Sequence, residues 1–271
     1  MSKQRLDVLL VEKGYFESRQ QAQRAIMAGL VRVNQERVDK PGAKIPADAV
    51  LEVTGQVHPF VSRGGLKLLE AIRAFQLDLT ERVVIDIGAS TGGFTDCALQ
   101  HGAKRVYAVD VGYGQLAWKL RQDPRVVVME RTNFRYMKPE DLPGEQPDLA
   151  TIDVSFISLS HILPPLYPIL RTGGDVIALI KPQFEAGKEQ VGKKGIVRDP
   201  AIHRQVIRAV LDMAASCGFQ PMGVIPSPIT GGEGNIEFLS RLTKSDTSSS
   251  SGIVTDEAIT EAVAEAHRRH A

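Results

Sequence analysis

From residue 82 onward, short apolar stretches alternate with stretches of helical periodicity. The apolar stretches have the length and composition of β-strands and lie at residues 82–87, 105–111, 126–129, 149–154, 175–180, 219–225 and 236–241. Helical spacing of apolar residues is found near residues 65–75, 93–100, 115–122, 158–170 and 201–217. Strands that alternate with helices favour a largely parallel sheet with helices on both faces. The pattern therefore predicts an α/β fold with a seven-stranded sheet.

The last two predicted strands, 219–225 and 236–241, are separated only by a loop. A loop of that length is too short for the crossover helix that a parallel pair requires, so we expect the final strand to be antiparallel to its predecessor. An antiparallel last strand brings its first residues to the edge of the sheet where the parallel strands end.

The first 57 residues show a different pattern of short helices and short strands. Ser18 and Gln21 match a capping box that begins a helix, and Gly29 suits the residue after its end. Residues 31–33 and 50–53 alternate like strands. We expect a small α+β domain at residues 1–57, a linker at 58–61 and the α/β domain at 62–243.

The remaining residues, 244–271, are predicted to be a flexible linker and tail. The linker is the serine-rich stretch 245–252, and residues 256–270 fit a short exposed helix to which we assign no chemistry.

Composition excludes several classes of protein. Lys and Arg number 33 against 32 Asp and Glu, so nucleic-acid binding must come from local patches. Cys97 and Cys217 are too few for a disulfide scaffold and show no metal-ligand spacing, which favours a cytoplasmic protein without a metal. The longest uncharged stretch, 154–170, contains three prolines and is too short to span a bilayer, and residues 1–7 do not fit a signal peptide.

The stretch VVIDIGASTGGF at residues 83–94 reads as a strand, a glycine turn and the start of a helix. Ligands bind at such turns, at the carboxyl edge of open α/β sheets. Serine occupies position 90, where a dinucleotide-binding turn needs glycine, and Asp86 suits a positively charged ligand such as the amino group of S-adenosylmethionine. The candidate cofactor-binding residues here are Asp86, Gly88, Ser90, Gly92, Gly93 and Phe94.

Two further residues are candidates for the same ligand. Asp110 ends the second strand, where an acid can accept hydrogen bonds from both ribose hydroxyls. Asn133 follows the third strand and could reach an adenine, although an asparagine in a loop is more often part of a turn.

Charged residues occur in four apolar or strand-end contexts: Lys67, Asp153, Lys181 and Glu237. Each alone has an ordinary structural explanation, as a surface charge, a helix cap, a strand end or an ion-pair partner. Asp153 and Lys181 end the fourth and fifth strands, and the antiparallel strand directs Glu237 to the same edge. Together they form a candidate catalytic group.

Two sets of basic residues are candidates for contact with phosphates. The first domain could carry a stripe of four arginines, Arg19, Arg24, Arg32 and Arg37, although charge alone favours an ordinary solvated surface. Lys188, Lys193 and Lys194 lie in a glycine-containing loop that is either a flap over RNA or a plain exposed loop.

The run RLDVLLVEKGYFESRQQAQRAIMAGLVRVNQERVDKPGAKI resembles an S4 domain, the small RNA-binding module of a ribosomal protein and of pseudouridine synthases. The resemblance implies docking on folded RNA through basic residues, here Arg5, Arg19, Arg24 and Arg32, that contact phosphates without reading sequence.

The order Lys67, Asp153, Lys181, Glu237 is similar to the K-D-K-E tetrad of FtsJ-type RNA ribose 2′-O-methyltransferases. The phrases FVSRGGLKL, DIGASTGGFT, IDVSFISL, LIKPQFE and GNIEFL, behind an S4-like domain, resemble the TlyA (hemolysin A) family. The resemblance implies a Rossmann-like methyltransferase sheet, S-adenosylmethionine as cofactor and ribosomal RNA as partner, with cytidine of 23S and possibly 16S rRNA as the target. FtsJ itself has a proline in the glycine turn where this chain has Ser90-Thr91, which loosens the parallel for the cofactor turn.

In the implied reaction Lys181 activates the ribose hydroxyl, either as a base or as a positioning cation. Three alternatives remain. A non-catalytic RNA-binding assembly factor would not need the charged tetrad, and an NAD-dependent oxidoreductase fits poorly with Ser90 and an S4-like domain. A membrane-lytic protein would need an apolar or amphipathic segment that the sequence lacks.

Overall fold

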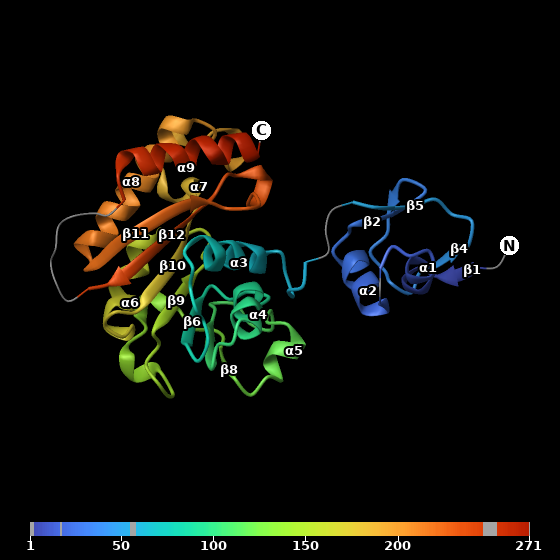
Figure 1. Cartoon of the computed structure of the whole chain (residues 1–271), viewed down its shortest axis with the longest axis horizontal. Coiled ribbons are helices and arrows are strands. Elements are labelled where there is room, and N and C mark those ends of the chain that lie inside the picture. Colours follow the sequence, from blue (N-terminus) through green and yellow to red (C-terminus); the bar gives the residue numbers. More distant parts are fainter. Residues whose placement is uncertain (1–2, 17, 55–57, 246–253, 271) are drawn as a thin grey trace. The chain divides into compact units, whose positions relative to one another are not determined.

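The protein is described here by a computed structural model that covers residues 3–16, 18–54, 58–245 and 254–270. The chain divides into two compact units, Met1–Pro59 and Phe60–Ala271 (Figure 1). No helix within the described ranges is both long enough and apolar enough to cross a membrane.

The first unit is the small α+β fold expected from the sequence. Its helices are α1 (Leu6–Glu12) and α2 (Arg19–Met27), and its strands are β1 (Lys3–Arg5), β2 (Val31–Val33), β3 (Glu36–Arg37), β4 (Lys44–Pro46) and β5 (Leu51–Val53). β1 pairs with β4, and a second sheet has the order β3-β2-β5. The Ser18 side chain accepts a hydrogen bond from the Gln21 amide at 3.3 Å, which confirms the predicted start of α2.

The second unit is built on one seven-stranded sheet with the order β11-β12-β10-β9-β6-β7-β8. The strands are β6 (Val83–Ile87), β7 (Arg105–Val109), β8 (Val126–Met129), β9 (Leu149–Ile152), β10 (Asp175–Ile180), β11 (Phe219–Pro226) and β12 (Phe238–Lys244). β12 is antiparallel to both neighbours, β10 and β11, whereas the pairs between β10 and β8 are parallel. The prediction of an antiparallel last strand is therefore confirmed.

Helices cover both faces of this sheet. They are α3 (Gly64–Ala74), α4 (Gly93–Gln100), α5 (Trp118–Arg121), α6 (Leu163–Ile169), α7 (Pro182–Glu185), α8 (Pro200–Ser216) and α9 (Asp256–Arg269). Short 3-10 turns lie at Phe134–Tyr136, Pro139–Asp141, Leu159–His161, Lys188–Gln190, Lys193–Gly195 and Gly232–Gly234.

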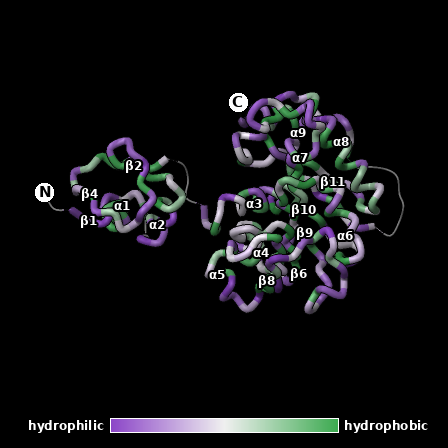
Figure 2. The backbone as a smooth tube through the Cα atoms, turned by 180° about the vertical axis from the view of Figure 1, so that it is seen from behind, coloured by the Kyte–Doolittle hydropathy of each residue, from purple (hydrophilic) through white to green (hydrophobic). Residues whose placement is uncertain are grey.

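Side chains alternate along each strand between two hydrophobic cores. In β10, Ile177 and Leu179 pack with residues of α3 and α4, whereas Ala178 and Ile180 pack with residues of α6, α8 and α9. The strand is buried at every position, and its apolar character is visible as a green segment in Figure 2. A strand buried on both faces is typical of a parallel sheet between two helical layers.

The C-terminal helix α9 differs from its prediction as an exposed helix. The helix lies beside α8 and β11 (Figure 1). Its residues Ile259, Ala262, Val263 and Ala266 are buried in the hydrophobic core. These four positions lie on one helical face, so a stripe of small and branched side chains makes the helix part of the core. The serine-rich linker falls on residues 246–253 for the most part and so lies outside the described residues.

Two predicted helices are shorter than their apolar periodicity suggested. The stretch 115–122 contains only α5, and 158–170 begins as a 3-10 turn before α6. Prolines at 164, 165 and 168 supply no amide hydrogen, which limits how many helical hydrogen bonds this stretch can form.

The second half of the predicted linker 58–61 is part of the folded second unit and not a linker. Phe60 is 3% exposed in the core beneath α3, and the Val61 amide donates to the Asp96 carboxylate at 2.8 Å. These two contacts attach the start of the second unit to α3 and α4.

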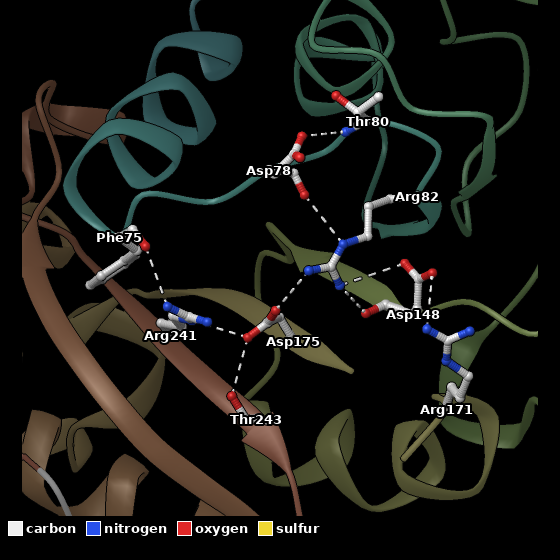
Figure 3. A network of polar contacts seen from close by, with 9 residues as sticks. All are labelled: Phe75, Asp78, Thr80, Arg82, Asp148, Arg171, Asp175, Arg241 and Thr243. Atoms are coloured by element: carbon white, nitrogen blue, oxygen red, sulfur yellow. Dashed lines mark hydrogen bonds and ion pairs between the residues drawn. The ribbon is translucent and has the colours of Figure 1, made fainter. Parts of the chain in front are cut away.

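A buried acid lies at the edge of the sheet opposite the glycine turn, where the parallel strands begin and the antiparallel strand β12 ends. Asp175 lies between Arg82 and Arg241 (Figure 3). The two guanidinium groups are 3.3 Å and 3.0 Å from its carboxylate, and Thr243 donates a third hydrogen bond at 3.1 Å. Arg82 also donates to the carbonyl oxygen of Asp148 at 3.1 Å. The network connects β6, β9, β10 and β12 and holds the sheet that carries the candidate site.

Candidate active site

The glycine turn after β6 is shaped by close backbone approaches. Gly88 has φ +86°, and a Cβ there would lie 2.5 Å from the carbonyl oxygen of Asp153. A Cβ at Gly93 would lie 2.3 Å from the Ser62 hydroxyl oxygen. Glycine is therefore required at both positions, because the turn packs directly against the end of β9 and the segment before α3.

Asp86 lies on the face of β6 that packs against α4. Its side chain is 1% exposed, and its two oxygens accept hydrogen bonds from the Thr95 hydroxyl at 2.6 Å and the Thr151 hydroxyl at 2.9 Å. Burial raises the pKa of Asp86 to about 6, while the two hydroxyl bonds oppose that rise. The sequence pointed to Asp86 but not to its threonine partners, which have no signature of their own.

The four residues predicted as a catalytic group lie together. Lys67 Nζ is 2.7 Å from Glu237 Oε2 and 3.8 Å from Asp153 Oδ2. Lys181 Nζ is 2.6 Å from Asp153 Oδ1. Asp153 therefore bridges the two lysines, and the four charges form one connected set.

Each of these side chains comes from a different element. Lys67 is on α3, Asp153 and Lys181 directly follow β9 and β10, and Glu237 directly precedes the antiparallel strand β12. Both lysines and Glu237 are less than a tenth exposed, so the ion pairs are shielded from solvent.

Two residues that the sequence analysis missed complete this group. The Ser155 hydroxyl accepts a hydrogen bond from Lys181 Nζ at 2.9 Å. A Cβ at Gly231 would lie 2.0 Å from Glu237 Oε1, so the loop before β12 is wrapped tightly around that carboxylate. Ser155 lies in a bend after β9, and neither it nor Gly231 had a local signal in the sequence that would have identified it.

Two cavities meet at the glycine turn. The first, of about 260 Å³, is lined by the four charged residues together with Asp86, Ser90, Gly93 and Phe94. The second, of about 350 Å³, is lined by Asp110 and Asn133. Both cavities include Gly88, Ser90, Asp153 and Ser155 in their walls, so together they have the size of an ordinary small-molecule site. Gly92 lines neither, and its φ of +94° begins α4 instead.

The second cavity carries polar groups at the ends of β7 and β8. The Asp110 carboxylate accepts hydrogen bonds from the Ser90 amide at 2.8 Å and the Gly112 amide at 2.7 Å. The Asn133 side chain accepts from the Arg135 amide at 3.2 Å. Apolar walls come from Val111, Phe134 and Ile157. An acid at the end of the second strand beside apolar walls suits the ribose and base of a nucleoside.

The basic residues predicted for RNA contact lie on two separate units. In the first unit, Arg5 and Arg19 each lie 3.0 Å from the fully buried carboxylate of Asp7. The Arg5 guanidinium holds the pKa of Asp7 well below its usual value, although burial opposes this effect. Arg24 and Arg32 are exposed.

In the second unit, Lys188, Lys193 and Lys194 are exposed on the loop that precedes α8. The buried residues Ile196 and Val197 attach the end of that loop to the core.

Comparisons with known proteins match both units. The family of FtsJ-like methyltransferases matches residues 60–244, and the S4 domain matches residues 4–51. The chain is 57% identical to "Putative rRNA methyltransferase YqxC" of Bacillus subtilis, over 98% of this chain and 95% of that one. It is 46% identical to "16S/23S rRNA (cytidine-2′-O)-methyltransferase TlyA" of Mycobacterium tuberculosis, over 86% of this chain and 87% of that one.

A solved structure described as "Putative hemolysin from Streptococcus thermophilus" superposes with a TM-score of 0.79 at 54% identity, covering 99% of this chain and 97% of that one. The matched regions, the fold and these relatives agree with the resemblance drawn from the sequence. The chain therefore belongs to the FtsJ-like methyltransferase family, among the members that carry an S4 domain and include the TlyA (hemolysin A) proteins.

Proposed function

We propose that this protein transfers a methyl group from S-adenosylmethionine to a ribose 2′-hydroxyl of ribosomal RNA, with a cytidine as the target. The relative from Mycobacterium tuberculosis carries that activity in its name, for 16S and 23S rRNA. The observation that carries the proposal is the connected set of two lysines and two carboxylates in the wall of the first cavity, next to the glycine turn, in which both lysines and Glu237 are buried and Asp153 is partly exposed.

The two joined cavities fit the proposed cofactor. Asp110 and Asn133 would hold its nucleoside end in the second cavity, and Gly88 and Ser90 would lie along its middle. Asp86 would favour its positively charged amino acid end, where a buried carboxylate lacks a cationic partner among the described residues. When bound, the cofactor supplies a methyl group on a positively charged sulfur, which is already a strong electrophile.

The side chains of the first cavity would then orient the ribose hydroxyl and hold or accept its proton. Lys181 Nζ is held by Asp153 and Ser155 at 2.6 Å and 2.9 Å, which leaves one further direction on the nitrogen for the substrate oxygen. Lys67 and Glu237 fix Asp153 from the other side. Alignment of this kind can supply about 7–11 kcal/mol of the barrier reduction, so positioning is the main task of this site.

The first unit would bring the RNA to this site. Arg5, Arg19, Arg24 and Arg32 would contact phosphates, and Lys188, Lys193 and Lys194 would contact the same RNA from the second unit. We also propose that residues 1–57 dock the substrate while residues 62–243 carry the chemistry. A ribosomal RNA substrate places this activity in the cytoplasm.

Two other functions were open from the sequence. An assembly factor without activity gives no reason to bury two lysines and Glu237 beside Asp153 in a cavity wall, since burying charges costs free energy unless each is paired. An NAD-dependent enzyme would bind a pyrophosphate at the glycine turn, where Asp86 and Ser90 line the cavity instead.

The test replaces Lys181, with methylation of ribosomal RNA as the readout. Lys181→Ala should lose methyl transfer but keep cofactor affinity and RNA binding. Lys181→Arg should also fail if the amine accepts the hydroxyl proton, because a guanidinium stays charged at any working pH. Lys104→Ala is the matched control, because Lys104 is an exposed lysine at the far edge of the sheet.

The substrate is identified by mapping ribose methylation in ribosomes from cells with and without the protein. One or more 2′-O-methyl marks should disappear from cytidines. An unchanged map, or wild-type activity in Lys181→Ala, would overturn the proposal, whereas an active Lys181→Arg variant would show that Lys181 is a positioning cation.

A further inference from the structure

The last turn of α9 lies outside residues 60–244, the part of the chain matched to the methyltransferase family. It nevertheless contacts three segments, each of which either carries Lys67 or is connected to Glu237 by hydrogen bonds. The contacts are made by His267, Arg269 and His270.

The first contact runs through α8. His203 is fully buried, and its Nε2 lies 3.2 Å from the carbonyl oxygen of Val197, to which it can only donate. Its Nδ1 must therefore accept, and His267 Nε2 lies 3.0 Å away as the donor. Burial lowers the pKa of His203 to about 4, which keeps this ring neutral at working pH.

Val197 connects His203 to the loop before Glu237 through further hydrogen bonds. Its amide donates to Asn235 Oδ1 at 3.2 Å, and Asn235 Nδ2 donates to the carbonyl oxygen of Gly232 at 3.1 Å. The Gly231 amide donates to the carbonyl oxygen of Asn235 at 2.8 Å. Asn235 thus fixes the loop that wraps around the Glu237 carboxylate.

The second contact reaches Glu237 through the backbone. His270 Nε2 donates to the carbonyl oxygen of Ser227 at 3.0 Å, and the Ser227 amide donates to the carbonyl oxygen of Glu237 at 2.9 Å. Ser227 directly follows β11 and is fully buried, so its carbonyl oxygen needs a hydrogen-bond donor from within the protein. His270 supplies that donor, and the amide of the same residue holds Glu237.

The third contact reaches the helix that carries Lys67. Arg269 Nη1 lies 3.3 Å from the Glu70 carboxylate on α3. Glu70 is three residues after Lys67, so both lie on neighbouring positions of one helix face. Lys67 in turn donates to Glu237 Oε2 at 2.7 Å. All three contacts of α9 therefore converge on this one ion pair.

We propose that the last turn of α9 positions the Lys67–Glu237 ion pair, with His267 and His270 as positioning residues for methyl transfer. The proposal rests on the proposed function, since it assigns these residues a role in that same reaction. Neither histidine lines the two cavities, so both act through Glu237 and not on substrate or cofactor.

The kinetic test compares His267→Ala/His270→Ala with wild-type protein. kcat should fall by about tenfold or more, because small displacements of aligned groups are costly, while KM for RNA and cofactor affinity stay within about twofold. His267→Gln keeps a donor for His203 and should recover most of the activity that His267→Ala loses. Arg268→Ala is the matched control, because Arg268 is exposed on the same turn and takes part in none of the three contacts.

Hydrogen exchange tests the same idea without any activity. In cofactor-free protein, the amides of Ser227, Gly231 and Asn235 should exchange faster in the double variant, while amides of β6 and β7 remain unchanged. Unchanged exchange at these amides, unaltered kcat, or a loss that His267→Gln fails to rescue would overturn the proposal. A wild-type protein without methylation activity would reject the proposed function but would leave the exchange result to decide the positioning role.

Discussion

Asp86→Asn should stabilise the free protein and at the same time weaken cofactor binding. The carboxylate is 1% exposed and accepts hydrogen bonds from Thr95 and Thr151, yet burial still raises its pKa from 3.8 to about 6. Folding therefore takes this group into surroundings that disfavour its charge. An asparagine has nearly the same shape and no charge, and the two hydroxyls can rotate to accept or donate as its amide requires.

The magnitude follows from the difference between the folded and unfolded pKa of Asp86. A carboxyl group with a raised pKa binds its proton more tightly in the folded state than in the unfolded state. Ionisation of Asp86 therefore leaves the free energy of unfolding unchanged well below pH 3.8 and lowers it by the full amount well above pH 6. A difference of about 2.2 pKa units corresponds to about 3 kcal/mol at pH 8, and to only about 0.5 kcal/mol at pH 4. Asp86→Asn should therefore raise the free energy of unfolding by up to about 3 kcal/mol at pH 8.

Urea denaturation followed by circular dichroism at pH 8, 6 and 4 measures this difference. Asp212→Asn is the control, because its exposed side chain should change the free energy of unfolding by less than about 0.5 kcal/mol at every pH. Calorimetry should show that Asp86→Asn binds S-adenosylmethionine more weakly. A variant that is less stable than wild type at pH 8, or a gain that does not shrink as pH falls, would refute the reasoning.

Three further predictions concern separate parts of the chain. Asp110→Ala should lower the affinity for S-adenosylmethionine at least about tenfold by calorimetry, while the free energy of unfolding falls only by about 1–2 kcal/mol, because its two bonds go to loop amides. Residues 58–271 alone should bind the cofactor but methylate ribosomal RNA poorly, and undiminished methylation would contradict the docking role of the first unit. Asp175→Ala should lower the free energy of unfolding in urea by about 3–5 kcal/mol, because Arg82 and Arg241 lose their shared buried partner; a loss below about 1 kcal/mol would show that the network contributes little.

The sheet and the grouping of the charged residues could be predicted because they follow from chain geometry. Asp153 and Lys181 each end a parallel strand, and parallel strands end at one edge of a sheet. The short connection before the last strand settled its direction, which placed Glu237 at the same edge. Lys67 could not be placed in this way, because α3 precedes the sheet; its apolar surroundings marked it as unusual, but only the resemblance to the tetrad grouped it with the other three.

The partners of these residues could not be predicted, because nothing in their local sequence distinguishes them. Thr95 and Thr151 hold Asp86 from a helix and a neighbouring strand that are far apart in the chain. Ser155 and Asn235 are loop residues of types that usually only make turns. Their roles arise from which segments meet in the folded chain, and a single sequence does not contain that information in any local pattern.

The packing of the C-terminal helix α9 was likewise not predictable from its local sequence. Its buried stripe of Ile259, Ala262, Val263 and Ala266 is half alanine, so the apolar signal is weak beside the charged residues around it. Small side chains are suited to close approach between helices, and α9 packs against α8 in the same hydrophobic core. A helix whose own apolar face is small gains its stability from that partner and not from its propensity. The same close packing brings the last turn of α9 within hydrogen-bond distance of His203 and Ser227. The small side chains on its buried face therefore weaken the sequence signal of this helix and also allow it to reach the segments around Glu237.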